Sequence, residues 1–463
     1  MSQLKIFNTL HREKQPFVPI EEGKVGLYVC GMTVYDYCHI GHARVMVVFD
    51  VVARYFKYLG YDVKYVRNIT NIDDKIIARA AEAGEDFMDL TKRFIDEMHQ
   101  DEASLNVLHP NEEPLATNSI DSIVRMIETL IDKGNAYAGP NGDVYYSVES
   151  FDNYGQLSGR KLDDMNAGER VEVDKNKRNP FDFVLWKSAK PSEPFWPSPW
   201  GNGRPGWHIE CSAMATCCLG NHFDIHGGGM DLQFPHHENE IAQSEAATGE
   251  HYVNTWMHNG FVRIDDEKMS KSLGNFFTVR EVLKQYRGEE IRFFVLSSHY
   301  RSPLNYSDEQ LNESRSALER LYTALRGIDA KQGEGKSDLI VRFEEAMNDD
   351  FNSAKALSVM FECANELNKL KRSNPDKAAE KAADLLTMAR PLGLLNQNPD
   401  DFLKSSTGSK ASASVENIEI KISERLEAKE QKNWMLADRI RDELKEQGII
   451  LEDKGNLTTW RRA

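Results

Sequence analysis

The chain has 463 residues, too many for one ordinary hydrophobic core, so we expect about three or four domains. Its hydrophobic fraction of 40% and charged fraction of 28% are typical of a soluble globular protein, and no run of about 18 apolar residues could span a membrane. The net charge of −16 argues mildly against nucleic-acid binding over the whole surface, and six cysteines without a CxxC pair argue against a disulfide framework or a zinc finger. Residues 1–17 hold no long apolar stretch, so we expect a cytoplasmic protein with no membrane contact.

The first predicted elements form a strand–helix–strand unit. Residues 25–30 are a short apolar run that ends in a turn at Gly31, which is typical of a buried strand. Apolar side chains at helical spacing then predict a helix over residues 43–59, and Gly60 stops it. Residues 62–69 form the next apolar run. This order indicates a parallel sheet covered by helices.

A second set of strands is predicted much later, over residues 222–226 and 256–264. The residues between the two sets are rich in turn signals and aromatic side chains. We interpret them as an insertion between two halves of one nucleotide-binding sheet. The expected segments are residues 1–105 for the first half, 106–205 for the insertion and 206–307 for the second half.

The last part of the chain is predicted to be helical. Four leucines fall on one helical face, namely Leu311, Leu318, Leu321 and Leu325. They indicate a helix bundle over residues 308–403. A Ser-rich linker over residues 404–414 precedes a small domain over residues 415–463, in which ten Lys and Arg stand against eleven Asp and Glu.

The motif His39-Ile40-Gly41-His42 lies where the first strand gives way to the first helix. A helix N-terminus offers free backbone N–H groups and partial positive charge, which suit a phosphate. The two imidazoles can donate hydrogen bonds to a triphosphate, and Gly41 lacks a Cβ, so a flat adenine could lie against the backbone. The alternative is a helix start that contains histidines by accident.

A second motif, Lys268-Met269-Ser270-Lys271-Ser272, lies far downstream in a polar stretch. Two lysines on a loop can close over the β- and γ-phosphates of ATP and neutralise the charge that develops as pyrophosphate leaves. In isolation, a solvated charged loop explains the same residues.

Together and in this order, the two motifs resemble the signatures of the class I aminoacyl-tRNA synthetases. The resemblance implies that ATP binds together with magnesium and that an amino acid attacks its α-phosphorus to give an aminoacyl-adenylate. The adenylate then passes its acyl group to a transfer RNA. It implies catalytic roles for His39, His42, Lys268 and Lys271. It implies ATP contacts for these four and for Gly41, Met269, Ser270 and Ser272. Positioning and charge stabilisation carry such chemistry, so no side-chain nucleophile is needed.

Four separated residues form a candidate metal site: Cys30, Cys211, His236 and Glu240. Two thiolates, an imidazole and a carboxylate form a plausible zinc set. The i, i+4 spacing puts His236 and Glu240 on one helical face, as two ligands require. Buried cysteines are, however, often only small apolar residues, and the histidines could serve the nucleotide instead.

Three motifs resemble the bacterial-type cysteinyl-tRNA synthetases: residues 28–36, 206–212 and 234–240. The resemblance runs along essentially the whole chain, to Trp460. It implies one zinc ion bound by the four candidate metal ligands, with the substrate thiol as a further ligand. It also implies that the protein is a monomer that binds tRNA(Cys), L-cysteine and ATP. A soft metal prefers a thiolate to an alcohol, whereas an apolar pocket separates cysteine from serine by only a few kcal/mol.

Four further residues are candidates for the cysteine pocket: Thr70, Trp207, His226 and Asp231. Thr70 could line it and Trp207 could wall it. Asp231 could hold the substrate ammonium or the ribose, and His226 could flank the same site. Each also has a simpler explanation, since a threonine can end a strand and a tryptophan is often a core residue.

Near the carboxyl end, Trp434, Arg439 and Arg441 are candidates for contact with transfer RNA. Arginine binds phosphates and aromatic rings stack on splayed bases. An ordinary surface helix explains them equally well from the residues alone. The resemblance implies an anticodon-binding domain here and a bundle that follows the tRNA stem. The expected fold is therefore α/β: a Rossmann-like catalytic domain with an insertion, then a helical bundle and a small anticodon-binding domain.

Two rival functions remain to be weighed. One is a ligase with the same cysteine-adenylating core and another acceptor, as in mycothiol synthesis, but such relatives lack a full anticodon domain. The other is a non-catalytic tRNA-binding paralogue, but such proteins typically lose one of the two nucleotide motifs, and both are intact here.

Overall fold

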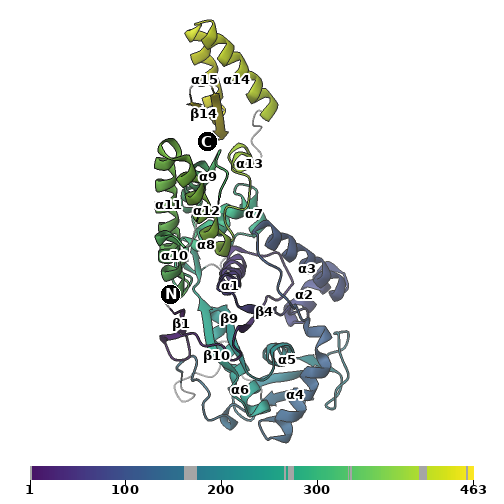
Figure 1. Ribbon diagram of the computed structural model, residues 1–463. Coiled ribbons are helices and arrows are strands. Elements are labelled where there is room, and N and C mark those ends of the chain that lie inside the picture. Colours follow the sequence, from purple (N-terminus) through teal and green to yellow (C-terminus); the bar gives the residue numbers. More distant parts are fainter. Residues whose placement is uncertain are drawn as a thin grey trace. The chain divides into compact units, whose positions relative to one another are not determined.

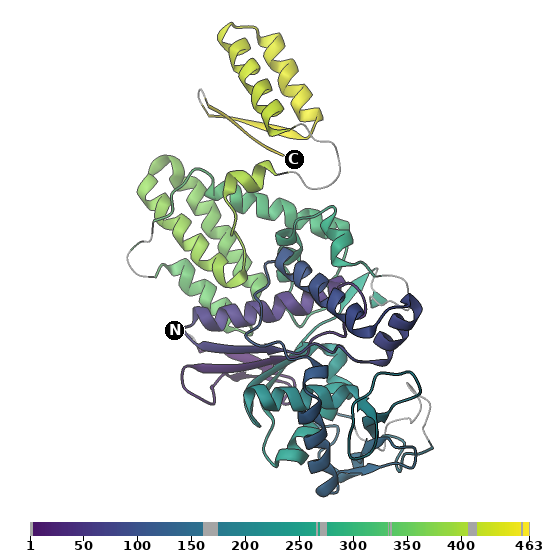
Figure 2. The same ribbon diagram turned by 90° about the vertical axis from the view of Figure 1, so that its right-hand side faces the viewer.

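The computed structural model describes residues 3–160, 175–264, 267–268, 276–331, 333, 336–405, 414–454 and 457–462 (Figures 1 and 2). The chain forms two compact units. The first comprises Met1–Val279, Ser298–Tyr306 and Glu344–Ala356, and the second comprises Arg280–Ser297, Ser307–Phe343 and Leu357–Ala463. None of the helices in the described ranges is both long and apolar enough to cross a membrane.

A four-stranded parallel sheet forms the centre of the first unit. Its strands, in spatial order, are β10 (Val253–Asn259), β9 (Phe223–Gly229), β3 (Lys24–Val29) and β4 (Asp62–Arg67). The chain passes from β3 to β4 on one side, while β9 pairs with β3 on the other side. The carboxyl ends of β3 and β9 therefore flank a topological switch point, where parallel α/β sheets bind their ligands.

Helices cover both faces of this sheet (Figure 1). Helix α1 (Ile40–Tyr58) lies on one face, and α5 (Trp207–Leu219) and α6 (Glu238–Thr248) lie on the other. Close packing against α1 requires a glycine on β9, because a Cβ at Gly227 would overlap the ring of Phe49. The first sequence-predicted strand, helix and strand are found as β3, α1 and β4, and the α/β fold class is confirmed.

The insertion contains a sheet of its own, which its turn-rich sequence did not predict. Strands β5 (Ala136–Ala138), β6 (Val144–Tyr146), β7 (Phe183–Ser188) and β8 (Gly203–Pro205) form an antiparallel meander. Helix α4 (Ile120–Asp132) packs against it through Ile123, Ile127 and Leu130, which share a core with Trp186.

Smaller elements complete the first unit. They are the hairpin β1 (Lys5–Asn8) and β2 (Glu13–Pro16), helices α2 (Asp74–Ala83) and α3 (Phe87–Ser104), and a sheet of β12 (Glu267–Lys268), β11 (Val262–Ile264) and β13 (Leu304–Asn305). Short helical turns span Ala116–Asn118, Val148–Ser150, Met230–Leu232 and Gln233–His237.

The second unit is mainly helical. It contains all or part of α7 (Val279–Leu283), α8 (Gly288–Leu296), α9 (Asp308–Leu325), α10 (Asp338–Asn348), α11 (Ser353–Ser373), α12 (Pro375–Leu392), α13 (Pro399–Lys404), α14 (Val415–Glu430) and α15 (Trp434–Glu446), with the hairpin β14 (Ile449–Lys454) and β15 (Leu457–Arg462). The four leucines that predicted the bundle are buried in α9. Helix α8 packs against α9 within the second unit.

Candidate active site and metal centre

The two histidines of the first motif cap helix α1. The backbone N–H of His42 donates to Nδ1 of His39 at 3.3 Å, and the backbone N–H of His39 donates to Nδ1 of His42 at 3.2 Å. Their rings stack with centroids 3.6 Å apart. Because Nδ1 of each neutral ring accepts a hydrogen bond, each ring carries its proton on Nε2, where it can be donated to a phosphate.

The segment that follows the second motif returns to the first. The N–H of Ile40 donates to the carbonyl of Phe277 at 3.1 Å, and the N–H of Val279 donates to the carbonyl of Cys38 at 2.8 Å. Only the backbone of Lys268 is described, as part of β12. The other predicted ATP-contacting residues of the motif, Met269, Ser270, Lys271 and Ser272, lie outside the described residues.

Sequence reasoning missed a buried arginine that joins these two regions. Arg44 lies on α1, two residues after the first motif, and is fully buried. Its Nη1 donates to the carbonyl of Phe261 at 2.7 Å, and its Nη2 donates to the carbonyls of Tyr300 (3.0 Å) and Ser302. It therefore ties the start of α1 to the beginning of β11 and to the turn before β13. Burial lowers the pKa of Arg44 from 12.5 to about 10.

The four predicted metal ligands come together beside the carboxyl end of β3. The Sγ of Cys30 lies 3.5 Å from the Sγ of Cys211, 3.5 Å from Nε2 of His236 and 3.3 Å from Oε1 of Glu240. Nε2 of His236 lies 3.1 Å from the same carboxylate oxygen. In tetrahedral zinc sites, bonds of about 2.0–2.3 Å place neighbouring ligand atoms about 3.3–3.8 Å apart, so this spacing fits a zinc ion.

Each ligand is positioned by a different element. Cys30 directly follows β3, and its N–H donates to the carbonyl of Gly227 on β9 at 3.0 Å. Cys211 projects from α5, His236 from the turn before α6, and Glu240 from α6. The switch point of the sheet thus brings together residues that are far apart in the chain.

The four groups are buried and their charges are strongly coupled. Burial raises the pKa of Cys30 well above its ordinary value. Burial acts in the same direction on Cys211, but the hydrogen bond from Cys30 and the neighbouring His236 bring the pKa of Cys211 down to about 6. Burial opposes charge on His236, yet Cys211 and Glu240 raise the pKa of His236 to about 10. The cluster therefore holds thiolate and carboxylate together, as a cation site requires.

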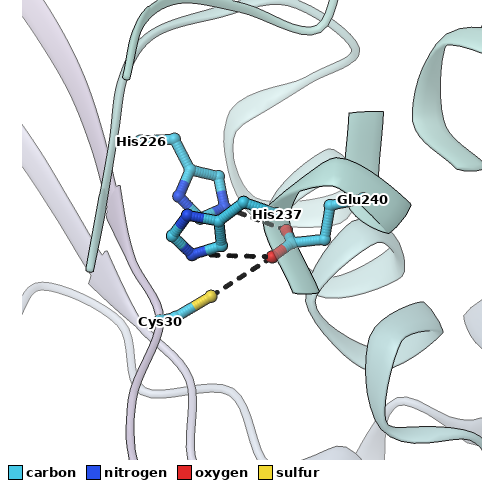
Figure 3. A group of neighbouring side chains, drawn as sticks. All are labelled: Cys30, His226, His237 and Glu240. Atoms are coloured by element: carbon cyan, nitrogen blue, oxygen red, sulfur yellow. Dashed lines mark hydrogen bonds and ion pairs between the residues drawn. The ribbon is translucent and has the colours of Figure 1, made fainter. Parts of the chain in front are cut away.

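A second, overlapping set of ligand atoms shares two of these residues. Cys30, His226, His237 and Glu240 also lie within 4.8 Å of one another (Figure 3). Nε2 of His226 lies 2.9 Å from Oε2 of Glu240, and Nε2 of His237 lies 4.0 Å from Oε1. The wider spacing at His237 makes this set a poorer fit than the set with Cys211. Sequence reasoning missed His237, although the two adjacent histidines of its motif gave a signal.

The four candidate pocket residues lie in different environments. Thr70 is buried and its Oγ1 donates to Oε2 of Glu210 at 2.9 Å. The ring of Trp207 lies 4.2 Å from the ring of His236, and its side chain is 40% exposed. Asp231 is exposed, on the short helix beyond the carboxyl end of β9.

His226 lies deeper than a substrate-contacting role suggests. It is completely buried, bonded to Glu240 and stacked on Trp256 with ring centroids 4.5 Å apart. Glu210, which the sequence reasoning passed over, precedes Cys211, and burial raises the pKa of Glu210 well above its ordinary value. A neutral Glu210 can accept the Thr70 hydrogen bond without adding charge to the site.

The predicted tRNA-contacting residues lie on α15. Trp434 begins the helix and is 59% exposed. Arg439 pairs with Glu443 at 3.6 Å, and Arg441 pairs with Asp438 at 3.1 Å. Acidic neighbours on the same helix thus offset part of the basic charge, while the indole stays open to solvent.

Comparison with known proteins first defines the class of this fold and site. Residues 16–316 match the family model described as the tRNA synthetases class I (C) catalytic domain, and residues 342–396 match the DALR domain. The structure resembles Mycobacterium tuberculosis methionyl-tRNA synthetase in complex with methionyl-adenylate, with a TM-score of 0.56, 15% identity and coverage of 80% of this chain and 89% of that chain. It also resembles the agnB2 LeuRS of Agrobacterium radiobacter K84 in a ternary complex, with a TM-score of 0.59, 13% identity and coverage of 83% and 87%. These distant likenesses show the fold, and the family model shows a class I tRNA synthetase.

Full-length relatives define the specificity. The cysteine–tRNA ligase of Methylococcus capsulatus is 64% identical over 99% of this chain and 100% of its own length, and that of Thioalkalivibrio sulfidiphilus is 62% identical over 99% and 100%. The chain therefore belongs to the cysteine–tRNA ligase family. It is an enzyme, and membership implies ATP-dependent aminoacylation of tRNA(Cys). The family and the reaction expected from the sequence are confirmed.

Proposed function

We propose that the chain selects cysteine with one zinc ion held by Cys30, Cys211, His236 and Glu240. The observation that carries this proposal is the convergence of the four donor atoms, with the measured separations between 3.1 and 3.5 Å. The set has two sulfurs, which favours zinc over magnesium or calcium.

A zinc ion at this position would supply an open coordination site for the substrate sulfur and would favour its thiolate form. Serine differs from cysteine by one atom, and its alcohol is a much poorer ligand for a soft metal. A discrimination of about 10⁴ corresponds to about 5.5 kcal/mol, which is within reach of this difference in ligand preference. Hydrolytic editing should then be unnecessary.

The surrounding side chains shape the rest of the cysteine pocket. Trp207, packed on His236 and partly open to solvent, forms a wall beside the proposed sulfur site. Thr70 and its partner Glu210 close the buried side. Asp231 is assigned to the substrate ammonium, and His226 would orient Glu240 through their 2.9 Å contact, as partners of metal ligands commonly do.

The ATP site is assigned to the first motif, at the start of α1, and to the second motif, which is followed by a segment bonded to the first. His39, Gly41 and His42 receive the nucleotide at the helix N-terminus, where backbone N–H groups and the helix dipole favour phosphate. Lys268 and Lys271 act on charge that appears as pyrophosphate departs, with Met269, Ser270 and Ser272 completing the loop. ATP enters with magnesium as a substrate.

The tRNA is assigned to the helical unit. The bundle, expected over residues 308–403, includes the matched DALR domain and follows the tRNA stem. The domain expected over residues 415–463 reads the anticodon, with Trp434 stacking on a base and Arg439 and Arg441 contacting phosphates. We also propose the remaining expected limits: residues 1–105, 106–205 and 206–307 for the catalytic domain and its insertion, and 404–414 for the linker. The enzyme is proposed to act as a monomer in the cytoplasm.

Zinc analysis combined with ATP–pyrophosphate exchange tests the proposal. Wild-type enzyme should contain zinc and support exchange with cysteine and not with serine. Cys211→Ser should lose the zinc ion held by these four residues and cysteine-dependent exchange together. Cys363→Ser is the matched control, because Cys363 is equally buried but contacts only the carbonyl of Lys381 among its recorded hydrogen bonds in the described structure. Full cysteine exchange by a Cys211→Ser enzyme that has lost one zinc ion relative to the wild type would show that the four residues are merely structural.

A further inference from the structure

A second cluster of ligand-type side chains lies away from the proposed cysteine site. His99 and Glu102 stand one turn apart on α3, and His109 and Glu113 stand four residues apart in the segment that follows this helix. One ligand atom from each of the four side chains lies within 4.8 Å of the other three. None of these four side chains has a role in the function proposed above.

The contacts within the cluster converge on one carboxylate oxygen. Nε2 of His99 lies 2.7 Å from Oε2 of Glu113, and Nε2 of His109 lies 3.7 Å from the same oxygen. The two imidazole rings lie 5.1 Å apart, edge to face. One imidazole is enough for an ion pair with Glu113. Here the Nε2 atoms of both His99 and His109 approach Oε2 of Glu113, as the ligands of a metal ion would. These distances bracket the separation of about 3.3 Å expected between neighbouring nitrogen and oxygen ligands of zinc.

A buried arginine fixes the two carboxylates from behind. Arg67, at the end of β4, contacts Glu102 at 2.5 Å and also pairs with Oε1 of Glu113. Its single positive charge offsets only one of the two carboxylates, so the cluster keeps one negative charge when both histidines are neutral. The carboxylate side chains are 4% and 9% exposed, and those of His99 and His109 are 35% and 64% exposed. The cluster is thus rigid at its base and open to solvent at its imidazoles.

We propose that His99, His109 and Glu113, with Glu102 as a fourth carboxylate ligand, form a second binding site for a transition-metal dication, with Zn²⁺ as the natural occupant. Two imidazoles and carboxylate oxygens match the ligand preference of zinc and differ from the all-oxygen sets that bind calcium or magnesium. The open side leaves a position for water. This site is independent of the proposed cysteine-selecting zinc and shares no residue with it.

The position of the cluster indicates what bound metal would stabilise. The segment that carries His109 and Glu113 runs along the edge strand of the parallel sheet. The N–H of Arg67 donates to the carbonyl of Glu112 at 3.1 Å, and the N–H of Ile69 donates to the carbonyl of Pro114 at 2.9 Å. A metal ion would fasten α3 to this segment, and so to the strand end that leads into Thr70. Occupancy should therefore raise thermal stability, since a ligand that binds only the folded state stabilises it.

The test is a zinc titration of the purified holoenzyme, with its zinc content measured beforehand. His109→Ala is the principal variant, because His109 is exposed and its recorded contacts are only to Glu113 and His99 among the described residues. Glu113 is left intact because it also holds Arg67. The expected result is one further zinc ion bound by the wild type, with affinity weakened at least about tenfold in His109→Ala.

His251→Ala is the matched control. His251 is half exposed, pairs with Glu245 at 3.0 Å and lies beside the ring of His222 at 5.6 Å, so it offers the same residue types. Nε2 of His222, however, bonds to Asn254 at 2.7 Å, and these three side chains do not converge. This variant should bind the further zinc ion like the wild type and show the same rise in melting temperature on adding zinc. Equal zinc binding by wild type and His109→Ala, an equal loss in His251→Ala, or no further zinc in the wild type would each overturn the proposal.

Discussion

Replacing Arg44 by methionine should reduce catalysis far more than it reduces stability. The substitution removes three hydrogen bonds, but the carbonyls of Phe261 and Tyr300 keep backbone donors at 2.9 Å. The carbonyl of Ser302 loses the donor that the described structure assigns to it, which costs about 1–3 kcal/mol. In the opposite direction, burial lowers the pKa of Arg44 from its ordinary value to about 10, which corresponds to roughly 3 kcal/mol of unfavourable burial that methionine does not suffer. The free energy of unfolding should therefore change by no more than about 2 kcal/mol.

Catalysis depends on the geometry that Arg44 imposes. Without its guanidinium, the start of α1 and the strand leading to Lys268 lose their shared anchor, and a displacement of about 1 Å between reacting groups can lower a rate by about 100-fold. We expect the adenylation rate to fall by about 10- to 100-fold, with equilibrium binding of cysteine almost unchanged. Pre-steady-state adenylation, cysteine binding and urea unfolding on the same preparation measure the three quantities.

Arg54→Met is the control on the same helix. Arg54 pairs with Asp50 at 2.8 Å and donates to the carbonyl of Asn106 at 2.7 Å, remote from β11. This variant should lose about 1–3 kcal/mol of stability while adenylating at close to the wild-type rate. The reasoning is refuted if Arg44→Met adenylates normally, or if its loss of cysteine binding equals its loss of adenylation.

Three further predictions concern the loop, the sheet and the carboxyl-terminal domain. Lys271→Ala should slow adenylation and leave equilibrium cysteine binding unchanged, as pre-steady-state kinetics can show, because its charge is needed only as pyrophosphate leaves. Gly227→Ala should lower the free energy of unfolding by about 1–3 kcal/mol through overlap with Phe49, whereas Gly26→Ala, whose new Cβ meets its neighbours at 3.5–3.6 Å, should be tolerated in the same denaturant titration. Deleting residues 405–463 should keep cysteine-dependent exchange and sharply reduce charging of tRNA(Cys); unchanged charging would contradict the tRNA assignment of this region.

The elements predicted best from sequence were those whose pattern is local. The run 25–30 and the helical spacing after residue 43 are set by neighbouring residues, and they appear as β3 and α1. The insertion was predicted only as a turn-rich segment. Its strands β5 and β6 have three residues each, too short for an alternating pattern to stand out, and β6 also pairs with residues more than 35 positions away in β7.

For the candidate site too, features set by local spacing could be predicted from the sequence, and contacts between distant segments could not. The i, i+4 spacing of His236 and Glu240 is visible in the sequence, whereas the contact between Cys30 and Cys211 depends on the strand order. The roles of buried polar partners were harder to foresee. His226 was predicted to flank the substrate site, and its side chain points from β9 to Glu240, a direction that the linear sequence does not show (Figure 3).

The thiol end and the ATP end of the site are joined by one short connection between β3 and α1. It begins at Cys30 and ends at His39, and it is held against the strand end beside it. The N–H of Gly31 donates to Oδ1 of Asn68 at 2.9 Å, and a Cβ at Gly31 would overlap the carbonyl of Asn68. The N–H of Val34 donates to the carbonyl of Thr70 at 3.2 Å. Since the connection is held at both points, these two hydrogen bonds constrain the distance between the proposed sulfur site and the proposed phosphate-binding end of α1. In the proposed function, an amino acid bound through its sulfur would thereby be aligned with the α-phosphorus of ATP, and no side chain would need to act as a nucleophile.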